Sequence, residues 1–252
     1  MTLDLIASPL LQPLPHGFFG REGGASSGVF AGLNCGPGST DQAEAVTLNR
    51  ARVARALGVA PDRLLGVHQV HSAEVVVADG PLPEPRPRAD ALVTRTPGLA
   101  LSVLTADCQP VLLADPEGGV IGAAHAGWRG TLLGVLEATV DAMERLGARR
   151  GRIRAAIGPT ISQRAYEVGP ELMEEVLADD PAAARFFAGG RGDRLHLDLP
   201  GWGLWRLRRA GVAEAEWTRH CTYSDPARFF SYRRKVHRQE ADYGRLIAAI
   251  RL

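Results

Sequence analysis

The feature that most constrains the fold is a pair of apolar segments joined by a strong turn signal. Both lie within TADCQPVLLADPEGGVIGAAHAGWRG, residues 105–130. PVLLAD and VIGAAH are rich in Val, Leu and Ile, a composition that favours strands. DPEGG at 115–119 separates them and favours a tight turn. The sequence therefore predicts a β-hairpin with chemically active side chains near its open end.

The length of the turn determines which of these side chains meet. If residues 116–119 form the loop, residue i of the first strand faces residue 235 − i of the second, so Pro110 faces His125. Side chains alternate, so Cys108 shares a face with Pro110 and becomes a diagonal neighbour of His125, roughly 7–8 Å away. A thiolate and an imidazole at that separation can reach one metal ion through bonds of about 2.0–2.3 Å. A slip of one residue would place them on opposite faces.

A third ligand is available in the segment HQVH, which offers His68 and His71. On a helix both histidines would lie on one face, whereas on a strand only one of them could point to the metal. The surrounding LLGVHQVHSAEVVV favours a strand. The spacing alone leaves open which histidine is the ligand.

Helices and strands are expected to interleave along the rest of the chain. Apolar spacing predicts helices over residues 42–58, 131–146, 170–179 and 199–211. Strands are expected within 64–79, in ALVT, GLALSVLTADC and IRAAIGP, and in the extended segments CTYSD and FFSYRR. Several strand pairs are joined by tight turns, so we expect an α/β (α+β) fold of mixed β-sheets packed against helices.

Composition limits the possible partners and the compartment. The formal net charge is +1, from 29 basic and 28 acidic residues, so no global field favours nucleic acid or an anionic membrane. No stretch approaches the ~18 apolar residues of a membrane helix, and the N-terminus lacks the basic region of a signal peptide. Three widely spaced cysteines do not suggest a disulfide framework. We expect a cytoplasmic protein that binds a small-molecule substrate.

Seven segments together resemble the YfiH-like family, long catalogued as multicopper polyphenol oxidases or laccases. They are FFGREGGASSGVFAGLNCG, GVHQVHSAEV, ADALVT, GLALSVLTADCQPVLLAD, VIGAAHAGWRG, IGPTISQRAYEVG and CTYSDPARFFSYRR. The resemblance implies one compact layered domain over residues 1–252 and a zinc ion held by His71, Cys108 and His125. His71, the histidine of VHS, matches the family's ligand, and His68 does not.

The resemblance also implies an activity on purine nucleosides. Family members are reported to phosphorolyse adenosine, inosine, guanosine and methylthioadenosine and to deaminate adenosine, and a bacterial branch is linked to removal of wrongly built peptidoglycan precursors. Arg50 matches an active-site arginine of the family. The C-terminal motif departs from the family's threonine-glycine-arginine run, because only Gly244 and Arg245 remain.

Ligand arithmetic argues against the old laccase description. A multicopper oxidase needs several copper sites and many histidines, including His-x-His pairs. This chain has seven histidines and no such pair, and two of the seven belong to the expected zinc site. The zinc site of cytidine deaminases is also absent, because no PCxxC follows HSAE.

Other polar residues near these motifs are candidates for catalysis or substrate binding. Asp107 is expected to orient a ligand histidine or to shuttle a proton. Arg50 is expected to hold phosphate through paired hydrogen bonds. Asn34 is expected to contact substrate or hold a turn, and Arg129 to line the pocket or close the mouth of the hairpin.

Two alternative functions use the same residues. In a metal-free cysteine hydrolase acting on a peptidoglycan precursor, Cys108 would be the nucleophile, a histidine its base and Asp107 the orienting carboxylate. In a non-catalytic adaptor, a structural zinc would be closed by a fourth protein ligand, for which Cys221 and His68 are the candidates.

Overall fold

The computed structural model describes residues 2–252 and contains two large mixed β-sheets and one small sheet. In spatial order the six-stranded sheet consists of β13 (Glu214–Trp217), β9 (Arg154–Ile157), β7 (Gln109–Asp115), β8 (Val120–Ala126), β5 (Ala91–Thr94) and β4 (Val75–Val77). The five-stranded sheet consists of β1 (Leu5–Ile6), β2 (His16–Phe19), β14 (Leu246–Arg251), β6 (Ala100–Thr105) and β3 (Leu64–Leu65). The small antiparallel sheet consists of β10 (Glu167–Val168), β12 (Leu195–Leu197) and β11 (Phe187–Gly189).

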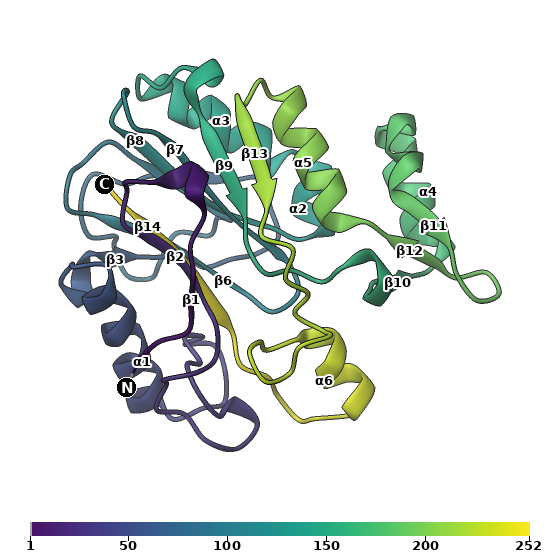
Figure 1. Ribbon diagram of the computed structural model, residues 1–252, viewed down its shortest axis with the longest axis horizontal. Coiled ribbons are helices and arrows are strands. Elements are labelled where there is room, and N and C mark those ends of the chain that lie inside the picture. The colour runs from purple at the N-terminus through teal and green to yellow at the C-terminus, as the bar shows by residue number, and fades with distance from the viewer. Residues whose placement is uncertain (1) are drawn as a thin grey trace.

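The helices flank these sheets (Figure 1). The α-helices are α1 (Ala43–Ala56), α2 (Trp128–Leu133), α3 (Val135–Arg145), α4 (Pro170–Asp179), α5 (Leu199–Arg209) and α6 (Tyr232–Arg238). Short 3-10 turns occur at Pro9–Leu11, Gly28–Phe30, Pro61–Arg63, Arg150–Arg152, Gln163–Ala165 and Pro181–Phe186. Among residues 2–252, no helix combines the length and the apolar character that a bilayer crossing requires.

The hairpin of β7 and β8 lies inside the molecule because it is apolar on both faces. Leu113 packs with α3 and α5 in one cluster, whereas its neighbour Leu112 packs with Leu101 and Val103 of the five-stranded sheet. A further cluster joins the other face of that sheet to α1 through Val53. The resulting order of layers is helices α3 and α5, the six-stranded sheet, the five-stranded sheet and helix α1. The hairpin belongs to the six-stranded sheet.

The structure confirms the main predictions for the fold. Pro110 pairs with His125 and Asp115 with Val120, which is the register derived from the four-residue turn. The helices expected over 170–179 and 199–211 are α4 and α5, and the helix expected over 42–58 is α1. The sheets are mixed and packed with helices, as predicted.

Four local predictions were wrong. CTYSD, expected to be extended, forms one isolated bridge at Cys221 and then turns. The helix expected over 131–146 is two helices, because Gly134 adopts φ 88° between α2 and α3. FFSYRR does not stay extended: the Ser231 hydroxyl accepts a hydrogen bond from the N–H of Arg234 and starts α6. In the strand-rich segment 64–79 only β3 and β4 form, and both histidines lie in the loop between them.

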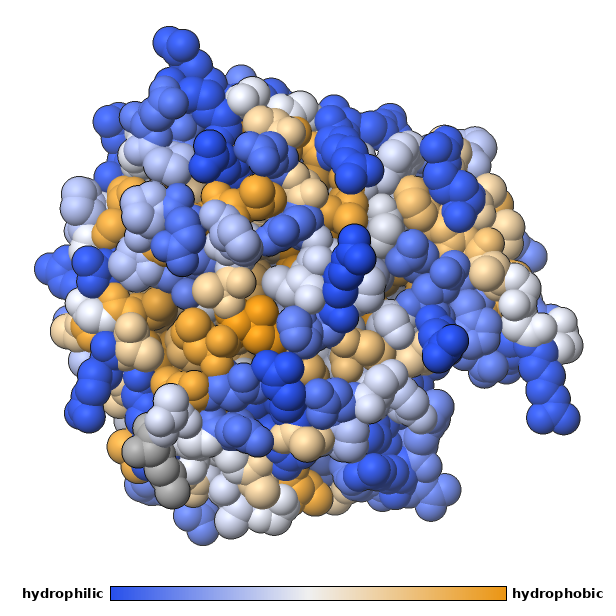
Figure 2. Space-filling model, in the orientation of Figure 1, coloured by the Kyte–Doolittle hydropathy of each residue, from blue (hydrophilic) through white to orange (hydrophobic). Residues whose placement is uncertain are grey.

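A small lobe completes the fold on one side. It contains α4 and the β10–β12–β11 sheet, which pack around the fully buried Trp202 of α5. Figure 1 shows this lobe projecting beyond α5, with α6 below it. In the space-filling view the surface is hollowed between the lobe and the region of α6 (Figure 2).

The two leucines Leu112 and Leu133 provide a test of the packing. Leu112 is 0% exposed, whereas Leu133 is 57% exposed. Leu112→Ala removes buried methyl groups and leaves a cavity, so it should lower the free energy of unfolding by about 2–5 kcal/mol in urea denaturation. Leu133→Ala should change it by less than about 0.5 kcal/mol. Equal losses in the two variants would contradict the layer order.

Candidate active site and metal centre

Two of the expected ligands lie at the open end of the hairpin. Cys108 immediately precedes β7, and His125 lies on β8 and is 4% exposed. After β8 the chain passes Gly127 and enters α2. A Cβ atom at Gly127 would lie 2.8 Å from the Sγ atom of Cys108 and 3.2 Å from the ring of His71. Only glycine leaves room for these side chains to converge.

His71 reaches the same point from the loop between β3 and β4. Its φ is 61°, in the left-handed region that residues other than glycine rarely adopt. The buried Asp90 holds this conformation from both sides. One of its carboxylate oxygens accepts hydrogen bonds from the N–H groups of Val70 (3.1 Å) and Ser72 (2.6 Å), and from the Ser72 hydroxyl (2.9 Å).

The other carboxylate oxygen of Asp90 orients His125. It lies 2.8 Å from Nδ1 of His125, and the backbone N–H of His125 donates to the carbonyl of Asp90 at 2.7 Å. Burial alone would raise the pKa of Asp90, but the hydrogen bonds from His125 and Ser72 outweigh burial and lower it to about 2. An ionised acceptor at Nδ1 leaves Nε2 of His125 free to act as a ligand.

The structure thus brings together His71, Cys108 and His125, the one group of this metal-binding type within residues 2–252. Their ligand atoms all lie within 4.8 Å of one another, and Sγ of Cys108 is 4.0 Å from Nε2 of His71. Bonds to a tetrahedral ion place its ligands about 3.3–3.8 Å apart, so small side-chain rotations are enough to bind one ion. A fourth position would remain for a reactant.

The site is also electrostatically prepared for a thiolate. Burial alone would raise the pKa of Cys108, but the facing His125 outweighs burial and lowers it to about 6. Burial alone would lower the pKa of His125, but Cys108 and Asp90 raise it to about 9. Between these two values the metal-free protein holds a thiolate beside an imidazolium.

Asp107 lines the cavity beside Cys108, and within residues 2–252 its carboxylate has no hydrogen bond to either ligand histidine. Its φ is 92°, and its carboxylate accepts hydrogen bonds from the hydroxyls of Thr222 (2.6 Å) and Ser231 (2.9 Å) and from the N–H of Arg233 (2.6 Å). Burial raises the pKa of Asp107. Asp107 therefore ties the hairpin to the start of α6, and the carboxylate that orients a ligand histidine is Asp90.

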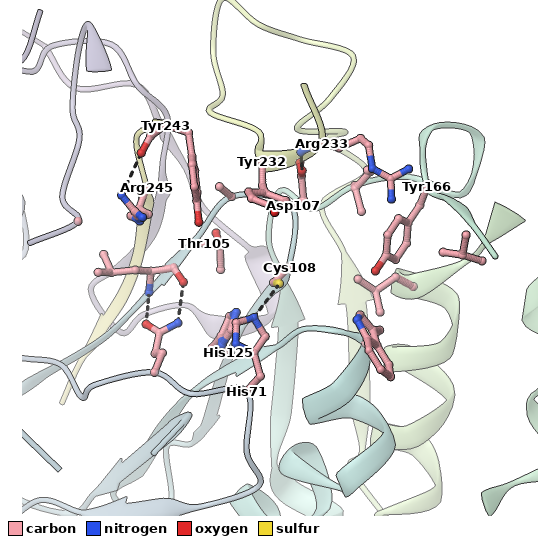
Figure 3. A pocket seen from close by; sticks show the side chains of 18 of the residues that line it. His71, Thr105, Asp107, Cys108, His125, Tyr166, Tyr232, Arg233, Tyr243 and Arg245 are labelled. Carbon is pink, nitrogen blue, oxygen red and sulfur yellow. Dashed lines mark hydrogen bonds between the residues drawn. The ribbon is translucent and has the colours of Figure 1, made fainter. Parts of the chain in front are cut away.

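The metal-binding group lies in the wall of a cavity of about 910 Å³, which Figure 3 shows from close by. On one side of Cys108 lie Tyr243 and Arg245, and on the other lie Tyr166 and Arg233 (Figure 3). The guanidinium carbon of Arg245 is 4.3 Å from the centre of the Tyr243 ring, and that of Arg233 is 5.3 Å from the Tyr166 ring. The cavity thus has an arginine stacked on a tyrosine on each side.

Asn34 lies behind the cavity wall with its side-chain amide fully engaged. Its oxygen accepts from the N–H groups of Gly36 and Arg245, and its NH₂ group donates to Ser39 and Asp41. These bonds hold a turn, which is one of the two roles expected for Asn34. The bond from Arg245 also fixes the backbone of that residue at the cavity wall.

Neither Arg50 nor Arg129 is among the side chains that line the cavity. Arg50 lies on α1, and its guanidinium donates to the carbonyl of Leu64 in β3 at 3.4 Å. Arg129 is exposed and stacks on the ring of Trp128, which does line the cavity.

The candidates for a fourth protein ligand do not join the group. The Cys221 thiol accepts hydrogen bonds from the hydroxyls of Ser162 (3.1 Å) and Ser224 (3.3 Å). His68 lines the cavity but stands outside the metal-binding group. The geometry therefore does not support a closed structural zinc site.

Sequence reasoning missed several side chains of the site. Asp90 lies in ADALVT, and Tyr166 and Arg233 lie in IGPTISQRAYEVG and CTYSDPARFFSYRR, which were noted only as parts of the resemblance. An acidic residue directly before a strand was the available signal for Asp90. Its partner could not be read from the sequence, because β5 pairs with β8 across a long separation.

A family model described as multi-copper polyphenol oxidoreductase laccase matches residues 15–252. The crystal structure of the hypothetical protein YfiH from Bacillus licheniformis is similar to this chain, with a TM-score of 0.85 and 30% identity over 94% of this chain and 92% of that one. The chain belongs to the YfiH-like family. The crystal structure of protein NMB0706 from Neisseria meningitidis has a TM-score of 0.89 and 35% identity, and covers 100% of this chain and 99% of its own.

Curated relatives of this YfiH-like chain carry an enzyme name. A protein named purine nucleoside phosphorylase from Deinococcus radiodurans is 45% identical over 99% of this chain and 93% of its own length. Another of that name from Streptomyces coelicolor is 47% identical over 86% of this chain and 89% of its own. The word multi-copper in the family description does not match the geometry, because residues 2–252 form one three-ligand group and not several.

Asp90→Asn should weaken metal binding without unfolding the protein. The change removes the negative charge that orients His125 and weakens the grip on the His71 loop. The affinity for Zn²⁺, measured against a chromophoric chelator, should fall roughly 10- to 100-fold. Asp115→Asn is the matched control, because Asp115 is equally buried at the other end of the hairpin. An unchanged affinity in Asp90→Asn would contradict the assigned role.

The Cys108 thiol of the metal-free protein should react at unusually low pH. Its alkylation rate should reach half its maximum near pH 6, about 6 being the pKa that His125 imposes, instead of near the ~8.5 of an ordinary cysteine. Peptide mass spectrometry separates this signal from Cys221, and Cys35 should stay unreactive because burial raises its pKa to about 12. His125→Ala should move the midpoint upward. A midpoint above pH 8 in the unmutated protein would refute the thiolate–imidazolium pair.

Proposed function

We propose that this protein is a zinc-dependent purine nucleoside enzyme. It phosphorolyses adenosine, inosine, guanosine and methylthioadenosine, deaminates adenosine, and works in the cytoplasm. The observation that carries the proposal is the three-ligand group of His71, Cys108 and His125 in the wall of a 910 Å³ cavity. The names of the relatives from Deinococcus and Streptomyces support the choice of purine nucleosides.

Zinc bound to this group supplies a Lewis acid that polarises water or a substrate oxygen. The protein itself holds the ligand side chains in a geometry close to the one that the metal requires. Asp90 fixes the tautomer of His125 and the backbone of His71, so the ligands need little reorganisation on binding. The low pKa of Cys108 removes the cost of deprotonating the thiol near neutral pH.

The cavity walls supply what a nucleoside and a phosphate need. Trp128 and Tyr166 offer aromatic faces on which a purine stacks. Arg245 offers a guanidinium group that binds phosphate oxygens through paired hydrogen bonds. The cavity volume lies within the range usual for small-molecule sites, roughly 300–1,000 Å³.

Of the remaining predicted residues, Asp107 is part of the cavity lining, and the others act in this proposal from outside it. Asn34 positions Arg245 through its backbone, and Arg129 holds the Trp128 ring in place by stacking on it. Arg50 adds positive charge beneath the wall formed by the residues after β3. Asp107 fixes the start of α6 and hence the base of the Arg233 side chain.

Product analysis tests the function directly. Zinc-loaded protein is incubated with adenosine, with and without inorganic phosphate, and the products are separated. Adenine and ribose-1-phosphate, formed only with phosphate, demonstrate phosphorolysis, and inosine demonstrates deamination. Cys108→Ala should lower both rates by more than roughly 100-fold, since even loss of a group that supports a metal ligand costs 10- to 100-fold. Cys221→Ala is the matched control, and absence of all three products in the unmutated protein would end the proposal.

One observation favours a second function, a cysteine hydrolase that acts on amides such as peptidoglycan precursors. Cys108, His125 and Asp90 are arranged as a nucleophile, a base and an orienting carboxylate. Asp90, and not the expected Asp107, contacts the histidine. Metal dependence separates the two functions. Turnover of an amide substrate that survives removal of zinc by a chelator supports the hydrolase. Turnover of adenosine that is lost when zinc is removed and returns when zinc is added supports the nucleoside enzyme.

A further inference from the structure

The charged side chains that line the cavity differ between the two sides of the metal-binding group. One side, which we call the anion arm, is lined by Gly36, Gly38, His68, Tyr243 and Arg245 and carries no carboxylate among its lining residues. The other side, the base arm, is lined by Trp128, Tyr166, Glu167, Glu171, Arg194 and Arg233. Figure 3 shows Arg245 and Tyr166 on opposite sides of Cys108.

Arg245 is fixed in place by its surroundings. Its backbone N–H donates to Asn34 at 2.9 Å, and its Nη1 donates to the carbonyl of Tyr243 at 3.0 Å. A Cβ atom at Gly36 would lie 2.2 Å from the Cδ of Arg245, so the glycine is needed for the side chain to pass. Within residues 2–252, Nη1 is the one guanidinium nitrogen of Arg245 with a hydrogen bond, and Nε and Nη2 are left for a ligand.

A second cation lies behind the anion arm. Arg50 interacts with Cys35, and the N–H of Cys35 donates to the carbonyl of Arg245 at 3.0 Å. Burial raises the pKa of Cys35 to about 12, so this thiol is neutral and does not offset the charge of Arg50. Among the described residues Arg50 forms no salt bridge. Asp242 lies 3.6 Å from Nη1 of Arg245 and offsets part of its charge. Arg50 has no such partner within residues 2–252, so an anion bound in the arm would complete the local charge balance.

The base arm differs because its lining includes two carboxylates, and its two arginines, Arg194 and Arg233, face them or other partners. Glu167 and Glu171 would repel a phosphate dianion, and Arg233 already donates through Nη1 to the carbonyl of Glu167 at 2.7 Å. Its Tyr166 and Trp128 rings, together with the apolar Leu172, suit a planar purine.

We propose that the anion arm, through Arg245 and His68, is the binding site for inorganic phosphate and that the base arm holds the purine. This assignment rests on the proposed function. Phosphate and purine then lie on opposite sides of the ribose, as displacement at C1′ requires. A phosphate oxygen forms the bond to C1′ while the bond from C1′ to the purine nitrogen breaks. The electron pair of that bond leaves with the purine, and the proton of hydrogen phosphate ends on the purine.

Calorimetric titration of inorganic phosphate into the zinc-loaded protein tests the site. Arg245→Gln should raise the dissociation constant roughly 10- to 100-fold, the loss expected for hydrogen bonds to a charged group. His68→Ala should raise it less. Arg233→Gln, in the base arm, and Arg154→Gln, at an arginine 44% exposed on β9, should bind phosphate as the unmutated protein does. Zinc content and thermal midpoint show that each variant is folded.

Kinetics separates failure of this assignment from failure of the proposed function. Arg245→Gln should raise the KM for phosphate with little change in the KM for inosine, and Tyr166→Ala should do the reverse. Unchanged phosphate binding in Arg245→Gln, or an equal loss in Arg233→Gln, overturns the anion arm. Phosphate binding that depends on Arg245 without any ribose-1-phosphate from the unmutated protein would leave the anion site standing and remove the phosphorolytic function.

Discussion

The site depends on one buried carboxylate. Asp90 is 0% exposed and joins three separate parts of the fold: the start of strand β5, the His71 loop and strand β8. A carboxylate buried in this way is tolerated only because each of its oxygens is hydrogen-bonded. The same bonds that stabilise its charge hold one histidine in a rare backbone conformation and the other in a defined tautomer. The hydrogen bonds that stabilise this one buried negative charge therefore also set the positions of the two histidines.

A second carboxylate, Asp107, does the corresponding work on the other side of Cys108. It ties the entrance of β7 to Thr222 and to the beginning of α6. Arg234 reinforces the connection from within α6 by donating to the carbonyls of Thr222 and Tyr223. Cys108 thus lies between two acidic residues with different tasks, one that holds the metal ligands and one that holds the cavity wall.

The sequence predicted the features that neighbouring residues determine, and it missed those that depend on contacts between distant segments. The register of the hairpin was predictable because a four-residue turn fixes it, and the amphipathic helices were predictable from their periodicity. The role of Asp90 was not, because its partners His125 and Ser72 come from segments 35 and 18 residues away. α6 was missed because aromatic residues suggest a strand, whereas the cap provided by Ser231 overrides that preference. The tyrosine–arginine pairs that flank the metal-binding group depend on tertiary packing and leave no local pattern.

The position of the last strand has a consequence for how the protein is made. β14 ends at Arg251 and lies between β2 and β6, in the middle of the five-stranded sheet. Until the ribosome has released this segment, the first strands of the chain have no partner on that side, and Arg245 at its entrance has no place in the cavity. Because such distant pairing forms late, a nascent or C-terminally truncated chain carries the hairpin ligands without a completed pocket around them.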